Sequence, residues 1–167
     1  MATTIKYPLT FSVFQNVGAG QPAPVRKKTE ADTQSFVYGA PLVFDLSEED
    51  VKLATDTTVE GIGIAMSYAT GTGGSDIYVM EFGPHILFRA PILNAGAAAA
   101  ADAAYVGRAF SWIARTDGYG YGIDVNDESS NDWFVVRALD PNTPDGTSAG
   151  FAIVSVLPAV YDQYSVA

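Results

Sequence analysis

Short runs of β-branched and aromatic residues alternate along the chain with turns that contain Gly or Pro. Apolar runs of about four to eight residues between such turns predict β-strands. The strands are expected at residues 42–46, 59–68, 76–82, 85–90, 105–114, 133–139 and 151–157. Many short strands with little helix between them predict a mostly β fold, organised as a small barrel or sandwich.

Some segments depart from the plain strand pattern. Gly61 and Gly63 fall inside an expected strand, which indicates a bulge or a barrel corner. Residues 47–50 have the Ser-x-x-Asp form of a helix start and predict one helical turn. Residues 71–75 are expected to form a mobile hairpin loop. The Ala-rich stretch 94–104 is expected to be a connector with at most one or two helical turns, although its small side chains would also allow a close contact between subunits.

The beginning of the chain has a strand pattern of its own. Large apolar residues alternate at Leu9, Phe11 and Val13, and Phe14 breaks the period. A Gly- and Pro-rich hinge at residues 18–25 then ends any regular structure. Two interpretations follow: an arm that adds a strand to a neighbouring subunit, or a strand of the protein's own barrel.

The net charge of the chain changes sign near residue 35. Residues 1–35 carry Lys6, Arg26, Lys27 and Lys28 against Glu30 and Asp32, a net charge of +2. Residues 36–167 carry five basic and seventeen acidic residues, a net charge of −12, and the two parts together give −10. We therefore expect an extended basic N-terminal arm at 1–35 and a β-barrel domain at 36–167. The arm is either a solvated tail or a segment that docks on an acidic surface.

Composition favours one soluble domain. The chain has 167 residues, of which 48% are hydrophobic and 17% charged, so it can bury a core of ordinary size. It contains no Cys, which excludes disulfides and thiolate metal sites. A secretory signal pattern and an apolar run of about 20 residues are both missing, so we expect a soluble, non-secreted protein. The acidic body is expected to repel nucleic acid.

The sequence offers little for catalysis. His85 is the only His, and no nucleophile-elbow pattern is present, so a Ser-His-Asp system is not expected. Nineteen acidic residues make chance carboxylate pairs unavoidable, and a glycosidase-like pair or a small hydrolase is kept as an alternative. We expect no enzyme activity, no catalytic residues and no cofactor.

Two kinds of loop approach ligand-binding motifs but lack their essential residues. The acidic run 124–132 is similar to a Ca²⁺ loop, yet Ser129 stands where the EF-hand pattern needs Gly and Val135 where it needs Glu. The Gly-rich segments 71–74 and 118–122 lack the Lys-Ser/Thr of a phosphate-binding loop. We therefore expect turns at these places and no bound metal.

A large part of the chain resembles a known family. Gly39-Ala-Pro-Leu-Val, a short acidic connector and Gly61-Ile-Gly-Ile-Ala-Met resemble the core of the tailed-bacteriophage capsid decoration (head-stabilising, cement) proteins. The resemblance continues through Asp102-Ala-Ala-Tyr-Val-Gly-Arg-Ala-Phe to Gly150-Phe-Ala-Ile-Val-Ser-Val-Leu. It covers residues 36–157 as a pattern of Gly, Pro and apolar positions, without an invariant chemical signature.

The resemblance implies a function and a location. Members of the family place a small β-barrel on the outside of the phage head, where they brace the major capsid protein, often as trimers. This chain is therefore expected to be a structural virion protein that clamps neighbouring capsid subunits. Its partners would be the major capsid protein and further copies of itself, with neither nucleic acid nor membrane. It would be assembled in the host cytoplasm.

The candidate partner-binding residues lie in the arm, because apolar anchors beside a cationic cluster suit docking on an acidic surface. They are Tyr7, Leu9, Phe11, Phe14, Arg26, Lys27 and Lys28. The alternative function is a carbohydrate-binding or adhesin-like β module of a virion or cell surface. Its stacking platforms would be Trp112, Trp133, Tyr119 and Tyr121, unless these residues pack in the core.

Overall fold

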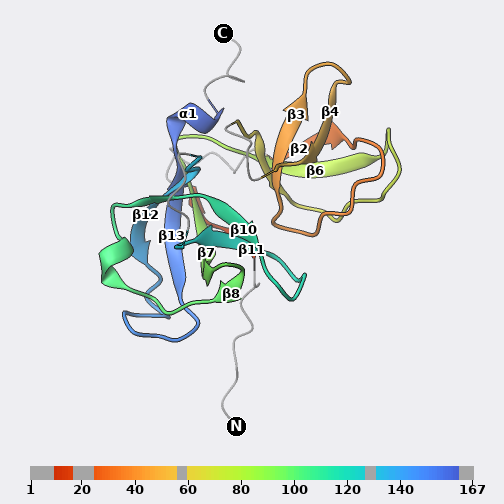
Figure 1. Ribbon diagram of the computed structural model, residues 1–167. Helices are drawn as coiled ribbons and strands as arrows, with labels where there is room; N and C mark the ends of the chain where they lie inside the picture. The colour runs from red at the N-terminus through yellow and green to blue at the C-terminus, as the bar shows by residue number, and fades with distance from the viewer. Residues whose placement is uncertain (1–9, 17–24, 56–59, 127–130, 162–167) are drawn as a thin grey trace.

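The computed structural model describes residues 10–16, 25–55, 60–126 and 131–161. Over these residues the protein is mostly β, as the sequence predicted (Figure 1). The strands are β1 (Ser12–Asn16), β2 (Val25–Thr29), β3 (Pro41–Asp45), β4 (Asp50–Leu53), β5 (Gly63–Ala65), β6 (Asp76–Glu81), β7 (Ile86–Asn94), β8 (Ala97–Ala98), β9 (Ala109–Phe110), β10 (Trp112–Ala114), β11 (Tyr121–Asp124), β12 (Phe134–Leu139) and β13 (Phe151–Val156). Helical structure in the described residues is limited to the 3-10 turn η1 (Ala103–Tyr105) and the short helix α1 (Pro158–Tyr161).

The strands form two sheets that lie side by side (Figure 1). The larger sheet has the order β10-β11-β7-β13-β12-β9, and β1 and β8 also pair with β7. The smaller sheet has the order β2-β6-β5-β3-β4. A parallel bridge between Glu30 and Val51 brings the chain after β2 against β4, so the smaller sheet curls back on itself.

Strand β7 organises the larger sheet because it changes partners along its length. Residues 86–91 pair with β1 and β13, whereas residues 92–94 pair with β11 and β8. Pro91 lies where β7 changes partners. Proline has no N–H group, and its absence disturbs the hydrogen bonds between strands least at such a position. The pairing with β11 is parallel, while the other three are antiparallel.

An aromatic core joins the two sheets into one structural unit. Phe82, which follows β6 of the smaller sheet, meets the rings of Phe88, Trp133 and Phe134 edge-on, with centroids 5.8, 6.0 and 6.0 Å apart. Phe11 stacks on Phe134 with its centroid 4.6 Å away. Each fully buried aromatic side chain contributes about 1.5–3 kcal/mol to folding, so this cluster is a main source of stability.

The part of the expected N-terminal arm that the structure describes is built into the two sheets. Strand β1 pairs with β7, and β2 pairs with β6. Phe11 has no exposed surface. The interpretation of the arm as separate from the β-domain is therefore wrong for residues 10–16 and 25–35. The alternation around Phe11 belongs to a strand of the protein's own fold, because its aromatic ring completes the core.

The two glycines inside the expected strand 59–68 are required by close packing rather than by a bulge. Strand β5 has only three residues. A Cβ atom at Gly63 would overlap the Met80 carbonyl oxygen of the neighbouring strand β6, and a Cβ atom at Gly61 would lie 2.5 Å from the Trp133 ring. Glycine is needed at both positions because another group already occupies the side-chain space.

We expect Gly61→Ala to lower the free energy of unfolding by about 1–3 kcal/mol, the usual cost of forcing an extra methyl group into a packed core. Gly83→Ala is a matched control, because a Cβ atom there meets nothing within 4 Å. The control should stay within about 0.5 kcal/mol of the parent protein. Urea denaturation followed by Trp fluorescence measures both, and equal midpoints would contradict the packing argument.

The helical turn expected from residues 47–50 is wrong. Residues 46–49 form a tight turn, and β4 then pairs antiparallel with β3. The Asp45 carboxylate accepts hydrogen bonds from the Ser47 N–H at 2.9 Å and the Ser47 hydroxyl at 2.6 Å, and Glu49 has a φ of 56°. The acidic residue therefore caps a turn instead of a helix, because the side-chain hydrogen bonds stabilise the reversal of the chain.

The Ala-rich stretch is a connector, as the sequence predicted. Ala95 and Gly96 both have positive φ and form the tight turn between β7 and β8. Its helical content is the single turn η1, where the Asp102 carboxylate accepts a hydrogen bond from the Ala104 N–H at 2.8 Å. The high helix propensity of Ala is not enough by itself to build a longer helix without apolar anchors.

Arg89 and Asp140 form a buried ion pair in the larger sheet, with side chains 7% and 1% exposed. Arg89 Nε donates a hydrogen bond to Asp140 Oδ2, and the guanidinium lies 3.5 Å from the centre of the Phe151 ring. Asp140 also accepts hydrogen bonds from the backbone and side-chain amides of Asn142, at 2.8 and 3.0 Å. Burial raises the pKa of the Asp140 carboxyl, but these hydrogen bonds and the positive charge outweigh it, so the pKa lies below its usual value.

Candidate functional site

Strand β2 carries the only cluster of basic residues, and it lies at the end of the smaller sheet. Its pairing with β6 sets Lys27 opposite Tyr78 and places Arg26 and Lys28 on the other face, since strand residues alternate. The side chains of Arg26 and Lys27 are 66% and 61% exposed. The fold therefore presents the cationic cluster to solvent.

Ion pairs within the chain hold the basic side chains over β2. Arg26 and Lys28 both approach Glu81, at 3.2 and 3.0 Å, and Lys27 lies 3.0 Å from Asp76. Exposed pairs of this kind contribute about 0–1 kcal/mol each and are screened by salt. Three basic residues face two carboxylates here, so this surface keeps an excess positive charge on an otherwise acidic protein.

The edge of β2 that faces away from β6 is partly covered by β4, through the parallel bridge between Glu30 and Val51. Glu30 N–H donates to the Ser75 carbonyl oxygen on the β6 side, and Ala31 N–H donates to Val51 on the opposite side. Because backbone groups alternate in direction along a strand, the amides of Val25, Lys27 and Thr29 also face away from β6. Within the described residues, none of these three outward-facing N–H groups has a backbone acceptor.

The chain after β2 is hydrogen-bonded to the loop before β6. The buried Glu30 carboxylate accepts hydrogen bonds from the Thr70 N–H and hydroxyl, both at 2.8 Å, and from the Gly71 N–H at 2.8 Å. Asp32 accepts a further bond from the Gly73 N–H at 2.8 Å. The sequence predicts a mobile hairpin loop at 71–75, and the structure shows that two carboxylates bind the backbone of this loop at Gly71 and Gly73.

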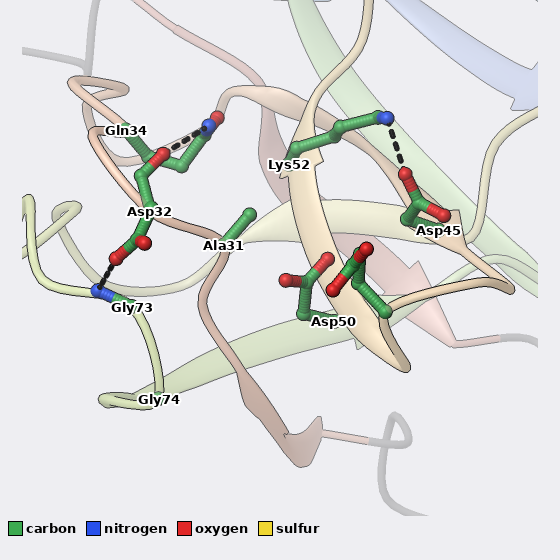
Figure 2. A pocket seen from close by; sticks show the side chains of 9 residues that line it. Ala31, Asp32, Gln34, Asp45, Asp50, Lys52, Gly73 and Gly74 are labelled. Atoms are coloured by element: carbon green, nitrogen blue, oxygen red, sulfur yellow. Dashed lines mark hydrogen bonds and ion pairs between the residues drawn. The ribbon is translucent and has the colours of Figure 1, made fainter.

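An acidic hollow lies beside this loop. Figure 2 shows Asp32, Asp45 and Asp50 around it, with Lys52 paired to Asp45 at 2.6 Å. The remaining lining residues are Ala31, Gln34, Glu48, Gly73 and Gly74. Hydrogen bonds from Lys52 and Ser47 lower the pKa of the Asp45 carboxyl, so it stays ionised. The hollow can attract cationic groups.

The structure separates the residues predicted to bind a partner. Phe11 lies in the core, which corrects its assignment as an exposed anchor. Phe14 is 46% exposed on β1 in the larger sheet, whereas the basic residues 26–28 lie in the smaller sheet. Tyr7 and Leu9 lie outside the described residues.

The aromatic residues proposed as glycan platforms do not form one surface. Trp133 is fully buried and Tyr121 is 7% exposed, so both pack in the core. Trp112 is half-buried, with its ring edge-on to Tyr121 and Trp133 at centroid distances of 5.9 and 6.1 Å. Tyr119 is 76% exposed.

The remaining candidates for catalysis or metal binding are His85 and the acidic run 124–132. His85 is exposed before β7. Asp124 is buried and accepts hydrogen bonds from the N–H groups of Ala95 and Asn126, at 3.2 and 3.1 Å, while residues 127–130 of the acidic run lie outside the described part. Among the described residues, no three His, Cys, Asp or Glu side chains come together in a group that could hold a metal ion.

Comparison of the chain with known protein families, curated proteins and solved structures finds no match. No helix among the described residues is long and apolar enough to cross a membrane. Inference about function therefore starts from the mostly β fold, the exposed basic side chains of β2 and the sequence pattern of residues 36–157.

Proposed function

We propose that this protein is a structural virion protein of a tailed bacteriophage, which binds the outer surface of the capsid and clamps neighbouring major capsid protein subunits. The observation that carries the proposal is the basic surface of β2, where the side chains of Arg26 and Lys27 are mostly exposed on an otherwise acidic protein. Such a surface suits attachment to an acidic surface of another protein. The resemblance of residues 36–157 to capsid decoration proteins supports the choice of partner.

The positions that carry the resemblance have clear roles in the fold. Gly39 has a φ of 84°, and a Cβ atom there would overlap the Thr10 side chain. Gly61 and Gly63 allow close packing against Trp133 and β6, as described above. The segment from Gly150 forms the buried strand β13. The resemblance therefore supports a shared architecture, while the binding function rests on the exposed basic side chains of β2.

Clamping follows from linkage between binding and assembly. A protein that binds two adjacent capsid subunits only while they are assembled adds its binding free energy to the cost of separating them. Stable interfaces of this kind bury about 1,200–2,000 Å² in total, so the basic surface of β2 would be part of a larger contact. Several contacts per particle, supplied by repeated copies, would then resist expansion and rupture of the head.

Electron microscopy of phage particles from the source of this chain tests the proposal. Gold-labelled antibody against the protein should mark the outside of intact heads, and image reconstruction should show its density at sites where capsid subunits meet. Heads that lack the protein should rupture at lower temperature than heads that carry it. Intact heads without label, from particles that otherwise contain every structural protein, would contradict the proposal.

We further expect the protein to form a homotrimer, because closed rings are the usual arrangement of identical subunits and the resembling family often uses trimers. Native mass spectrometry and light scattering, at low and at moderate salt, measure the mass directly. Acidic bodies repel one another, so added salt should favour the oligomer. A monomer both in solution and on particles would contradict this prediction.

A further inference from the structure

We propose that the protein holds its partner through two hairpin tips, one in each sheet, and that Leu46 and Tyr119 are their anchor residues. The Leu46 tip is the turn at residues 46–49 between β3 and β4, and the Tyr119 tip is the turn at residues 115–120 between β10 and β11. The inference rests on the proposed function, under which the two tips would engage two neighbouring subunits of the major capsid protein.

The two anchors stand out by their exposure. Leu46 and Tyr119 are each 76% exposed, more than any other large apolar side chain among the described residues. Figure 1 shows their turns at the ends of different hairpins, that of β3 and β4 and that of β10 and β11. Side chains this exposed add little to folding, because apolar groups stabilise a fold by leaving water. Their apolar surface contributes free energy only when another protein covers it.

An aspartate fixes the Tyr119 tip. Asp117 Oδ1 accepts a hydrogen bond from the Tyr119 N–H at 3.1 Å, and Asp117 Oδ2 forms an ion pair with Arg115 Nη2 at 2.6 Å. The Arg115 N–H also donates to the Gly120 carbonyl oxygen at 2.9 Å, which closes the turn at its base. The exposed ring is therefore presented by a backbone that hydrogen bonds define.

The Leu46 tip is fixed in the same way. Asp45 accepts a hydrogen bond from the Ser47 N–H at 2.9 Å and forms an ion pair with Lys52 at 2.6 Å. In both tips the carboxylate thus accepts the N–H group two residues later and pairs with a basic side chain of the same hairpin. An anchor that is ordered before binding loses less conformational entropy in the complex, so both tips are prepared for contact.

The surroundings of Leu46 indicate what its binding pocket contains. The exposed Glu48 and Glu49 follow it in the turn, and the acidic hollow lies beside the tip (Figure 2). In the hollow, Asp50 Oδ1 is buried and accepts no hydrogen bond from the described residues. The Leu46 tip therefore fits an apolar pocket with basic side chains at its rim, one of which could enter the hollow.

The Tyr119 tip fits a pocket of different chemistry. Arg115 and Asp117 neutralise one another, and the other residues of the turn carry no charge. A tyrosine ring has an apolar body and a polar hydroxyl, so its pocket is apolar with one hydrogen-bonding group. Two pockets with different requirements suit two separate contacts.

Two separate anchors on one structural unit give the clamp its strength. Phe82 and its aromatic neighbours join the two sheets, so the tips belong to one body. Once one tip is bound, binding of the second becomes intramolecular, and the overall affinity exceeds that of either contact by about 10²–10⁴. Released subunits do not hold the two pockets at a fixed spacing, so they lose this gain.

An alternative interpretation is that the anchors are ordinary surface residues. Single exposed apolar side chains are common, and aspartates stabilise many turns without any part in binding. Under this interpretation, truncation of Leu46 or Tyr119 would leave attachment to another protein unchanged. The two interpretations therefore differ in a measurable way.

The experiment measures cosedimentation of the full chain with purified phage heads, and binding to subunits released from the same heads. Leu46→Ala and Tyr119→Ala should each weaken attachment to heads about 30-fold, the usual loss at an anchor residue, and the double variant by about 30-fold again. Tyr119→Phe keeps the ring and should lose only about fivefold. The parent protein should bind heads at least about 100-fold more tightly than released subunits.

Exposed apolar residues outside both tips provide matched controls. Tyr68→Ala is the control for Tyr119→Ala, and Val106→Ala is the control for Leu46→Ala, because Tyr68 is 67% exposed and Val106 is 45% exposed. Both controls should stay within about twofold of the parent protein in attachment. Urea denaturation checks that all variants fold, which is expected because none of these side chains is buried.

The outcomes separate the two proposals. Attachment of the parent protein with unchanged binding of Leu46→Ala and Tyr119→Ala would overturn the inference and leave the virion function standing, as would equal losses in the controls. A double variant no weaker than the single ones, or equal binding of the parent to heads and released subunits, would overturn the two-point clamp. If the parent protein bound neither heads nor released subunits, the virion function would be refuted and the clamp with it.

Discussion

Deletion of residues 1–35 should leave a chain that does not fold, instead of a free β-domain. The deletion removes β1 and β2, an outer strand of the smaller sheet, together with the buried ring of Phe11 and the Glu30 carboxylate that holds the loop at 70–71. Loss of one core Phe ring typically costs about 3–5 kcal/mol, and whole domains are stable by only about 5–15 kcal/mol. Circular dichroism and thermal melting of the fragment 36–167 measure the effect.

Two single substitutions refine this prediction. Phe11→Ala should lower the free energy of unfolding by about 3–5 kcal/mol, because it leaves a cavity against Phe134. Phe14→Ala, three residues later on β1 and 46% exposed, should cost less than about 1 kcal/mol. A fragment 36–167 that melts like the parent protein would show that β1 and β2 are dispensable, against the pairing described above.

The second large effect is expected at the buried ion pair. Asp140→Ala should lower the free energy of unfolding by about 3–5 kcal/mol, since it leaves the Arg89 guanidinium buried without its carboxylate. Asp76→Ala is the matched control, because it breaks the exposed pair with Lys27 and should cost at most about 1 kcal/mol. Urea denaturation of both variants gives the comparison, and similar losses would show that burial of the pair is unimportant.

A double variant separates the pair itself from the cost of breaking it. Replacing both partners, as in Arg89→Met with Asp140→Leu, should cost less than Asp140→Ala alone, because no charge is then left buried. The residual loss would measure the hydrogen bonds that Asp140 accepts from Asn142. A double variant less stable than Asp140→Ala would show that the pair is favourable beyond avoiding an isolated charge.

The same pair should contribute to acid denaturation. The pKa of Asp140 is lowered in the folded protein, so its contribution is fully present above the unfolded pKa of about 3.9 and is lost as pH falls through the lower folded value. The stability difference between the parent protein and Asp140→Asn should therefore shrink below about pH 4. Asp45 and Asp117, whose pKa values are also lowered, act in both proteins and cancel from the difference.

The sequence by itself determined where most strands lie. The apolar runs at β6, β12 and β13 match the expected segments closely. The reason is local, because a strand buried on one face alternates between apolar and polar residues, while a strand buried on both faces, such as β13, is apolar almost throughout. It also identified the basic cluster of β2. It missed β11, since the glycines before Tyr121 indicated only a turn.

Long-range pairing was decided by the tertiary structure. The pattern around Phe11 predicts a strand but not its neighbour, which lies more than seventy residues away at Phe88 and Arg89. In the same way, Glu30 looked like one surface charge among many, and only the fold brings it to the amides of Thr70 and Gly71. Such contacts depend on the path of the whole chain, so a local pattern cannot specify them.

The candidate site also combines features that the sequence determines with features that only the tertiary structure decides. Charge in the sequence drew attention to Arg26, Lys27 and Lys28, but it could not say which strands lie beside them or which of their side chains share a face. The pairing of β2 with β6 sets Lys27 opposite Tyr78 and places Arg26 and Lys28 on the other face. A shift of the register by one residue would reverse the faces, so only the tertiary structure could decide how the basic side chains are presented.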